Sequence, residues 1–268
     1  MAGPAVTHCT DVLEETGFFL DATVNCGKPV IIAGAMRPST AISADGPFHL
    51  LEAVTVAASP SAMDRGAMVV MNDRIASAYY VTNPNVNTMD TFKAMEIGFL
   101  GLLISNTPYF FCPPVKPTGK RSYSVSNITS IPRVDILMAC EDMSIDTLDN
   151  AVSSGAKLTV VRILVYPNRD IECMLMCSQI AGAGAGGVST SFNNAMEDVI
   201  NNYQIPIVQS TRAMSGEVPS SGVFSDTALH IASGYPNPMK PHILLGILLA
   251  YRKNMTEIAD AFLGSTNA

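Results

Sequence analysis

The sequence has 268 residues, of which 48% are hydrophobic and 15% are charged, enough apolar material for one large domain or two smaller ones. Its formal net charge of −7, with no run of Lys or Arg, excludes nucleic acid as a partner, because binding to phosphates needs clustered positive charge. Two apolar stretches, 97–104 and 243–251, are far shorter than the roughly 20 residues of a membrane-spanning helix, so we expect no membrane partner. The first residues lack the basic and apolar regions of a signal peptide, which predicts a cytoplasmic protein.

Metal and cofactor motifs are also missing from the sequence. The six cysteines are scattered, and none has the paired spacing with histidine that is typical of a zinc site. The glycine-rich stretch at 182–187 is too isolated to indicate a dinucleotide site. We therefore expect neither a metal ion nor an organic cofactor.

The first half of the chain alternates helical patterns with short apolar runs. Residues 11–26 and 46–59 have the spacing of helices. The runs at 28–33 and 66–71 are continuous, apolar and rich in β-branched residues, which is typical of buried parallel strands. The order helix, strand, helix, strand predicts an α/β fold in which a parallel sheet is covered on both faces.

Local signals mark where these elements begin. Asp11 and Glu14 have the spacing of a capping box, which predicts that Asp11 caps the first helix. Pro47 suits the first turn of the second helix. Arg37 and Asp45 flank the loop after the first apolar run, where we expect an ion pair or a loop clamp rather than a catalytic role.

The middle of the chain divides it into two domains. Residues 113–133 are rich in Pro, Ser and Thr and have no amphipathic period. We therefore expect a larger N-terminal parallel-sheet domain at 1–114, incomplete because its first strands are missing, a linker at 115–132, and a smaller α/β domain at 133–268. In the second domain the patterns predict strands at 134–139, 158–166 and 205–209, and helices at 144–154, 193–203 and 241–253.

Five short strings of residues carry a family resemblance. The first two are T-H-C-T-D-V-L-E-E-T at 7–16 and G-A-M-R-P-S-T at 34–40, the latter followed by S-A-D-G at 43–46. The others are V-V-M-N-D at 69–73, G-A-G-A-G-G at 182–187, and S-T-R at 210–212 with G-E-V at 216–218. In these strings, and in their order, the chain resembles the L-asparaginase family from about residue 5 to its C-terminus.

The resemblance implies two α/β domains, a small-molecule amide or carboxylate ligand, and assembly as a homodimer or homotetramer. It implies that Thr10 and Asp11 are catalytic groups. Their position also favours a ligand site, because open α/β sheets bind ligands where a strand ends and a helix begins, and anions meet free N–H groups there. The family's substrate contacts match Thr7, His8, Cys9, Ala35, Met36 and Asn83.

Other positions depart from the family's pattern. The family's nucleophilic threonine lies in a T-G-G-T-I-like strand turn, and no T-G-G-T string occurs in this sequence, so we expect that strand to be absent. Asn83 stands where the family has the lysine of its proton relay, and an amide cannot carry a proton away at neutral pH. Cys9 replaces a glycine, Ala185 replaces an asparagine, and residues 165–179 have no counterpart.

These departures leave three hypotheses open. The first, which the residues favour, is that ordinary asparagine hydrolysis is lost and the chain is a repurposed small-molecule enzyme. Asp11 would then be its acid or base, and Thr10 and Thr7 would orient the substrate. The second is a genuine L-asparaginase represented by a truncated product. The third is a non-catalytic family member that binds a ligand or a partner.

Overall fold

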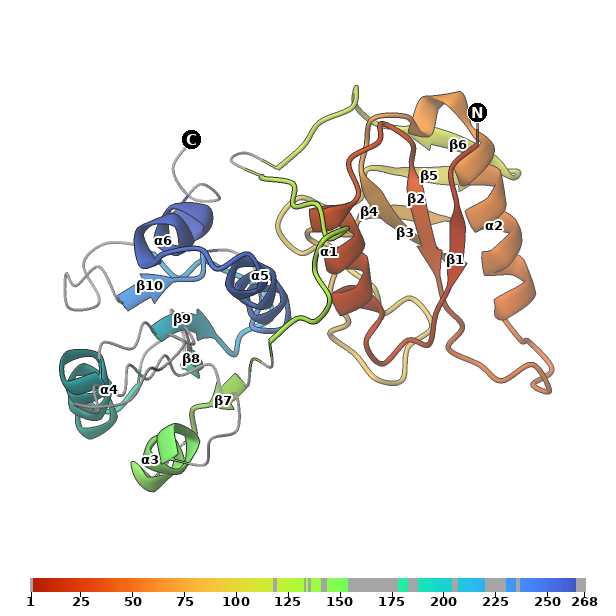
Figure 1. The fold of residues 1–268 in the computed structure, drawn as a ribbon. Coiled ribbons are helices and arrows are strands. Elements are labelled where there is room, and N and C mark those ends of the chain that lie inside the picture. Colours follow the sequence, from red (N-terminus) through yellow and green to blue (C-terminus); the bar gives the residue numbers. More distant parts are fainter. Residues whose placement is uncertain are drawn as a thin grey trace. The chain divides into compact units, whose positions relative to one another are not determined.

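The chain folds as two compact α/β units, Met1–Ser124 and Val125–Ala268, here called the N-terminal and C-terminal units (Figure 1). The computed structural model describes residues 2–117, 120–132, 134, 136–140, 144–153, 178–182, 188–203, 207–219, 230–234 and 237–263. The strand expected at 158–166, the unmatched residues 165–177 and the position of Ala185 lie outside these ranges.

The N-terminal unit is built on one six-stranded sheet with the strand order β1-β2-β3-β4-β5-β6. Its first three strands are parallel: β1 (Ala5–Thr7), β2 (Val30–Ala33) and β3 (Ala67–Met71). The other three continue the sheet as antiparallel hairpins: β4 (Arg74–Ser77), β5 (Gly101–Ile104) and β6 (Thr107–Phe110). The parallel strands confirm the prediction, whereas the antiparallel extension was not predicted, because strands this short carry little periodic signal.

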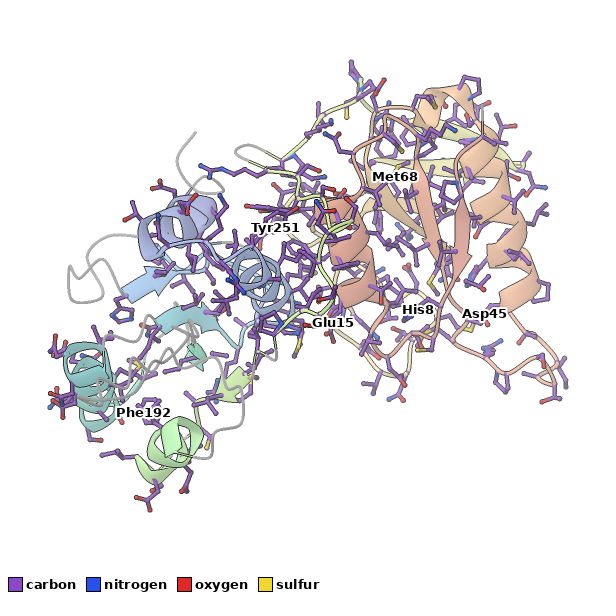
Figure 2. All side chains as sticks on the ribbon, viewed as in Figure 1. His8, Glu15, Asp45, Met68, Phe192 and Tyr251 are labelled. Carbon is purple, nitrogen blue, oxygen red and sulfur yellow. The ribbon has the colours of Figure 1, made fainter. Side chains whose placement is uncertain are left out.

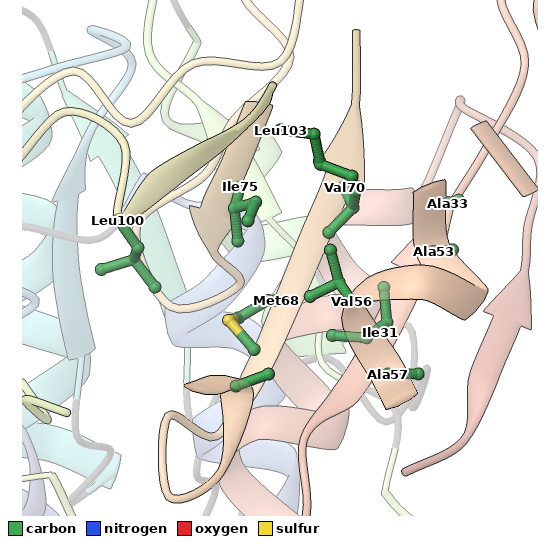
Figure 3. Packing of buried hydrophobic residues seen from close by; sticks show 11 residues of the cluster. Ile31, Ala33, Ala53, Val56, Ala57, Met68, Val70, Ile75, Leu100 and Leu103 are labelled. Carbon is green, nitrogen blue, oxygen red and sulfur yellow. The ribbon is translucent and has the colours of Figure 1, made fainter. Parts of the chain in front are cut away.

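Two helices cover opposite faces of this sheet, as Figure 1 shows: α1 (Leu13–Thr23) and α2 (Gly46–Ala58). Both were predicted, with Pro47 in the first turn of α2. One apolar cluster joins α2 to the side chains of Ile31 and Met68 (Figure 3). The other joins the α1 side to Ile32 and Val69. Because alternate side chains of a strand point to opposite faces, β2 and β3 are buried on both sides.

The placement of the two helices on opposite faces of the sheet determines the handedness of the two crossovers. The strands β1, β2 and β3 follow one another in the same direction, yet the crossovers through α1 and α2 lie on opposite faces. The two crossovers therefore have opposite hands, so one of them is left-handed, which is rare in parallel sheets. As a result, the loops that follow β1 and β2 start side by side at the carboxyl edge and lead to helices on opposite faces, as at a ligand-binding switch point.

The predicted capping box at the start of α1 is wrong. The N-cap residue of α1 is Val12, and no side chain caps the helix. Asp11 lies one residue further out and is exposed. Instead of bonding back to the cap, the Glu14 carboxylate accepts a hydrogen bond from the backbone N–H of Asn83 at 2.9 Å. A partner distant in sequence has therefore replaced the local one.

The C-terminal unit has a smaller, four-stranded parallel sheet with the strand order β10-β9-β8-β7. Its strands are β7 (Ile136–Met138), β8 (Ser178–Gly182), β9 (Ile207–Thr211) and β10 (His230–Ala232). Its helices are α3 (Asp146–Ser153), α4 (Thr190–Tyr203), α5 (Met239–Ala250) and α6 (Met255–Leu263). The sequence predicted all of these except β8, β10 and α6. None of the helices in the described ranges is long and apolar enough to cross a membrane.

Candidate functional site

The candidate site lies at the carboxyl edge of the N-terminal sheet, between the loops that leave β1 and β2. Figure 2 shows His8 and Asp45, one from each loop, at the same edge of the sheet. Hydrogen bonding brings the two loops together, because the His8 backbone N–H donates to the Ala33 carbonyl at 2.9 Å. Parallel strands thus bring residues that are far apart in sequence to one edge of the sheet.

The loop after β1 carries four of the predicted site residues. The His8 imidazole is fixed by contacts of its two ring nitrogens, Nε2 with Thr16 Oγ1 at 2.9 Å and Nδ1 with the Cys9 carbonyl at 2.7 Å. Cys9 and Asp11 are exposed, and Thr10 is half-buried. Within the described ranges, the Asp11 carboxylate has no hydrogen-bond or ion-pair partner. The loop therefore presents a hydroxyl and an accessible carboxylate side by side.

Gly34 allows the loop after β2 to approach the Thr10 loop closely. A Cβ atom at Gly34 would lie 2.9 Å from Leu13 Cδ1, 3.0 Å from the His8 carbonyl oxygen and 3.1 Å from Thr10 Cγ2. Such distances are shorter than ordinary contacts, so a side chain at Gly34 would force Leu13, His8 or Thr10 to shift. The packing therefore places the backbone of Gly34 against Thr10, and Ala35 and Met36 follow directly in the chain.

Asp45 holds the loop after β2 in shape. Its two carboxylate oxygens accept hydrogen bonds from the backbone N–H groups of Met36, at 2.8 Å, and Arg37, at 3.0 Å. Burial alone raises the pKa of Asp45, but these backbone bonds and the nearby His49 outweigh it, so the pKa is lowered. The predicted loop clamp is confirmed. Asp45 binds the backbone N–H of Arg37 and not its guanidinium group. The guanidinium group bonds to Ser43 instead.

A second buried contact supports the same loop. His49, which is 1% exposed, contacts the Gly34 carbonyl oxygen through Nδ1 at 2.9 Å and lies 3.6 Å from Asp45. Asp45 and His49 together hold both ends of the segment that contains Ala35 and Met36. Ala35 is exposed and Met36 is half-buried, so this segment can face a ligand.

Asn83 reaches the site from the segment after β4. Its backbone N–H bonds to Glu14 in the first turn of α1, so it lies next to the loop that carries Thr10 and Asp11. Its side-chain oxygen accepts a hydrogen bond from Thr91 Oγ1 at 2.5 Å. The structure thus brings Asn83 beside the β1 loop and gives its amide a structural partner. Thr7 ends β1 and is exposed at the same edge.

One notable residue near this edge was not predicted. Glu52 of α2 is fully buried, and one carboxylate oxygen accepts a hydrogen bond from the Asp73 backbone N–H at 2.7 Å, just beyond the carboxyl end of β3. Its other oxygen, Oε2, has no hydrogen-bond partner in the described part of the chain. Burial raises the pKa of Glu52 to about 7, and the negative charge of Asp73 adds to the effect. The signal in the sequence that could have indicated this residue was a single carboxylate within an otherwise apolar helical segment.

Two family models match the two halves of the chain. "Asparaginase, N-terminal" matches residues 1–116, and "Glutaminase/Asparaginase C-terminal domain" matches residues 179–262. L-asparaginase 2-3 of Saccharomyces cerevisiae is 42% identical over 267 residues, which cover 98% of this chain and 68% of the yeast protein. The chain belongs to the asparaginase family.

Further asparaginase relatives agree with this assignment. Probable L-asparaginase 1 of Schizosaccharomyces pombe is 42% identical over 97% of this chain, and the chain spans 65% of the length of that relative. L-asparaginase 2 of Bacillus subtilis is 38% identical over 97% of the chain. The crystal structure of a probable cytoplasmic L-asparaginase from Campylobacter jejuni superimposes with a TM-score of 0.83 at 32% identity, covering 98% of this chain and 75% of that structure. The predicted family and two-domain α/β fold are therefore confirmed.

Proposed function

We propose that the chain acts as an L-asparaginase, which hydrolyses the side-chain amide of L-asparagine to L-aspartate and ammonia. The observation that supports this most is the carboxyl edge of β1 and β2, where Thr10 lies against Gly34 and the next residue, Asp11, exposes its carboxylate. The names of the yeast and Bacillus relatives favour the same activity. They favour genuine L-asparaginase over the predicted loss of hydrolysis.

The chemistry needs a group that accepts a proton. In amide hydrolysis a hydroxyl or water oxygen bonds to the amide carbon, the C–N bond breaks, and the nitrogen leaves as ammonia with an added proton. The exposed Asp11 carboxylate would take the proton from the attacking oxygen and return it to the leaving nitrogen. The neighbouring Thr10 hydroxyl and the end of β1 at Thr7 would orient the substrate.

The test is ammonia release from L-asparagine and L-glutamine by the purified chain and by its Asp11→Asn variant. We expect release by the chain and a loss of at least about 100-fold in the variant, because the amide cannot accept the proton. Asp260→Asn is the matched control. Asp260 is an exposed aspartate of α6, so its substitution should leave the rate unchanged.

Asn83, which stands where the family has a lysine, favours a second candidate function. This is a repurposed enzyme that binds a small carboxylate without hydrolysing asparagine. The Asn83 amide accepts a hydrogen bond from Thr91 and cannot take up a proton at neutral pH. Absence of ammonia release from the chain, together with calorimetric binding of L-aspartate that Asp11→Asn weakens, would favour this candidate. Release by Asn83→Lys alone would show that the missing lysine is the limiting group. Equal ammonia release by the chain and by Asp11→Asn would contradict a role of Asp11 in proton transfer, both in the asparaginase and in the repurposed enzyme.

We also propose a homo-oligomer and a cytoplasmic location. The outer face of α2 supports oligomerisation, because it exposes large apolar side chains that a monomer would leave in water: Phe48, Leu50, Leu51 and Val54. Free thiols at Cys9, Cys26, Cys112 and Cys140 favour a reducing compartment. Labelling of these thiols without a reductant, in protein taken directly from cells, tests the location.

A further inference from the structure

A charged cavity lies in the N-terminal unit away from the residues assigned to the asparaginase site. It has a volume of about 170 Å³, more than ten times the roughly 10–15 Å³ that one water molecule needs. Its walls come from the end of α1, the turn before β2, the turn before β3, and residues 116 and 120–122. Four cationic side chains line it, against two acidic ones: Lys28, Lys116, Lys120 and Arg121 against Asp21 and Asp64. The cavity is therefore positive in a chain whose net charge is −7.

Buried contacts hold the cationic wall in place. Lys120 Nζ lies 2.6 Å from the Asp21 carboxylate, and Asp21 is only 3% exposed. The other Asp21 oxygen accepts the backbone N–H of Ala67 at 2.9 Å. Three residues after Lys120, the backbone N–H of Tyr123 donates to the Ala22 carbonyl at 2.8 Å. The segment that carries Lys120 and Arg121 is thus fixed to the end of α1.

Two glycines keep the cavity open. Gly66 has a φ of +77°, and a Cβ atom there would lie 2.5 Å from Asp21 Oδ1 and 3.3 Å from Lys120 Nζ. Gly27 has a φ of +71°, and its Cβ atom would lie 3.0 Å from Asp64 Oδ1. Any side chain at Gly66 would displace the buried ion pair, and both positions adopt the left-handed conformation that favours glycine.

The remaining cations of the lining form no ion pair within the described part of the chain. Asp21 already neutralises Lys120, whereas Lys28, Lys116 and Arg121 form no ion pair with any residue in the described ranges. Asp64 balances only one of these three charges. Converging positive side chains around a preformed hollow are the chemistry that recognises phosphate and carboxylate groups.

We propose that this cavity binds a small dianion, either inorganic phosphate or a short dicarboxylate. The proposal is independent of the proposed asparaginase activity, because none of the residues assigned to that activity lines the cavity. Cys26 does line it and is an exposed free thiol, so a bound dianion would cover the Cys26 sulfur.

Alkylation of Cys26 by iodoacetamide, followed by peptide mass spectrometry, tests the proposal without an activity assay. Phosphate and succinate are compared with chloride at equal ionic strength, and the exposed Cys140 serves as an internal control. We expect at least one dianion to slow alkylation of Cys26 about threefold or more, with no change at Cys140. Protection by phosphate alone identifies a phosphate site, and protection by succinate alone identifies a dicarboxylate site.

Charge variants show whether the cavity is responsible. Lys28→Gln and Lys116→Gln should each weaken the protecting dianion about threefold, and the double variant about tenfold, as expected for partly exposed charges. Arg252→Gln removes an exposed charge of the C-terminal unit and should leave protection unchanged. Lys116 is exposed, so Lys116→Gln keeps the test valid if the other variants fail to fold. Absence of protection by both dianions, or undiminished protection in Lys116→Gln, overturns the proposal.

Discussion

At the scale of single residues, the most unusual environment belongs to Glu52. It is fully buried between α2 and the turn after β3, where one oxygen bonds to the Asp73 backbone and the other has no hydrogen-bond partner among the described residues. A buried carboxylate is costly, so the protonated form is favoured and the pKa rises to about 7. This links the stability of the N-terminal unit to pH.

We expect the free energy of unfolding to fall as pH rises from about 4.5 to about 7. The pKa of Glu52 is raised above its unfolded value, so its contribution is complete below pH 4.5 and is lost as pH passes through the folded pKa. The change is on the order of 3 kcal/mol. Urea titrations of the chain and of Glu52→Gln near pH 5 and pH 8 measure it.

Glu52→Gln should remove this pH dependence and make the chain more stable near pH 8, because the amide can still accept the Asp73 N–H bond without a buried charge. Glu96→Gln, at an exposed carboxylate of the same unit, should retain the pH dependence. An unchanged slope in Glu52→Gln would show that other groups cause it.

At the scale of secondary-structure elements, α2 is apolar on all sides. Its inner face packs on the sheet through Ala53, Val56 and Ala57, while Leu51 and Val54 on the outer face are 50% and 51% exposed. A helix with apolar residues all round is normally buried. For the homo-oligomer that we propose, we therefore place the contact between copies of the chain on the outer face of α2.

The double variant Leu51→Lys/Val54→Lys should shift the chain to a smaller species in light scattering coupled to size-exclusion chromatography. Two desolvated charges at a packed interface are costly, whereas a solvent-facing helix tolerates lysine. Val86→Lys, at a loop residue that is 82% exposed, is the control and should leave the mass unchanged. An unchanged mass in the α2 variant would place the contact elsewhere.

At the scale of the whole molecule, the chain has two units with separate apolar cores. Ile31 of β2 and Ile247 of α5 are both fully buried, one in each unit. Truncation of either side chain to alanine leaves a cavity in the core of its own unit. The two units should therefore respond independently to core substitutions.

We expect Ile31→Ala to destabilise the N-terminal unit by about 2–5 kcal/mol and Ile247→Ala to destabilise the C-terminal unit by a similar amount. Native-state hydrogen exchange followed by mass spectrometry reports each unit through its own peptides. Equal loss of protection in both units after either substitution would show that they unfold as one cooperative block.

The sequence by itself determined the family, the two-domain α/β fold and the helices α1 to α5, because periodic apolar patterns and family strings are local properties. It also placed Thr10 and Asp11 after a strand and identified the loop clamp at Asp45. Each of these features depends on neighbours within about ten residues, so sequence alone could reveal it.

Only the tertiary structure decided which distant groups meet. It replaced the predicted cap with the Glu14–Asn83 bond, buried Glu52 under the Asp73 turn, and gathered Lys28 and Lys120 around one cavity. It also set the two crossovers on opposite faces of the sheet. These outcomes follow from long-range packing, in which desolvation and close approach select partners that local spacing does not encode.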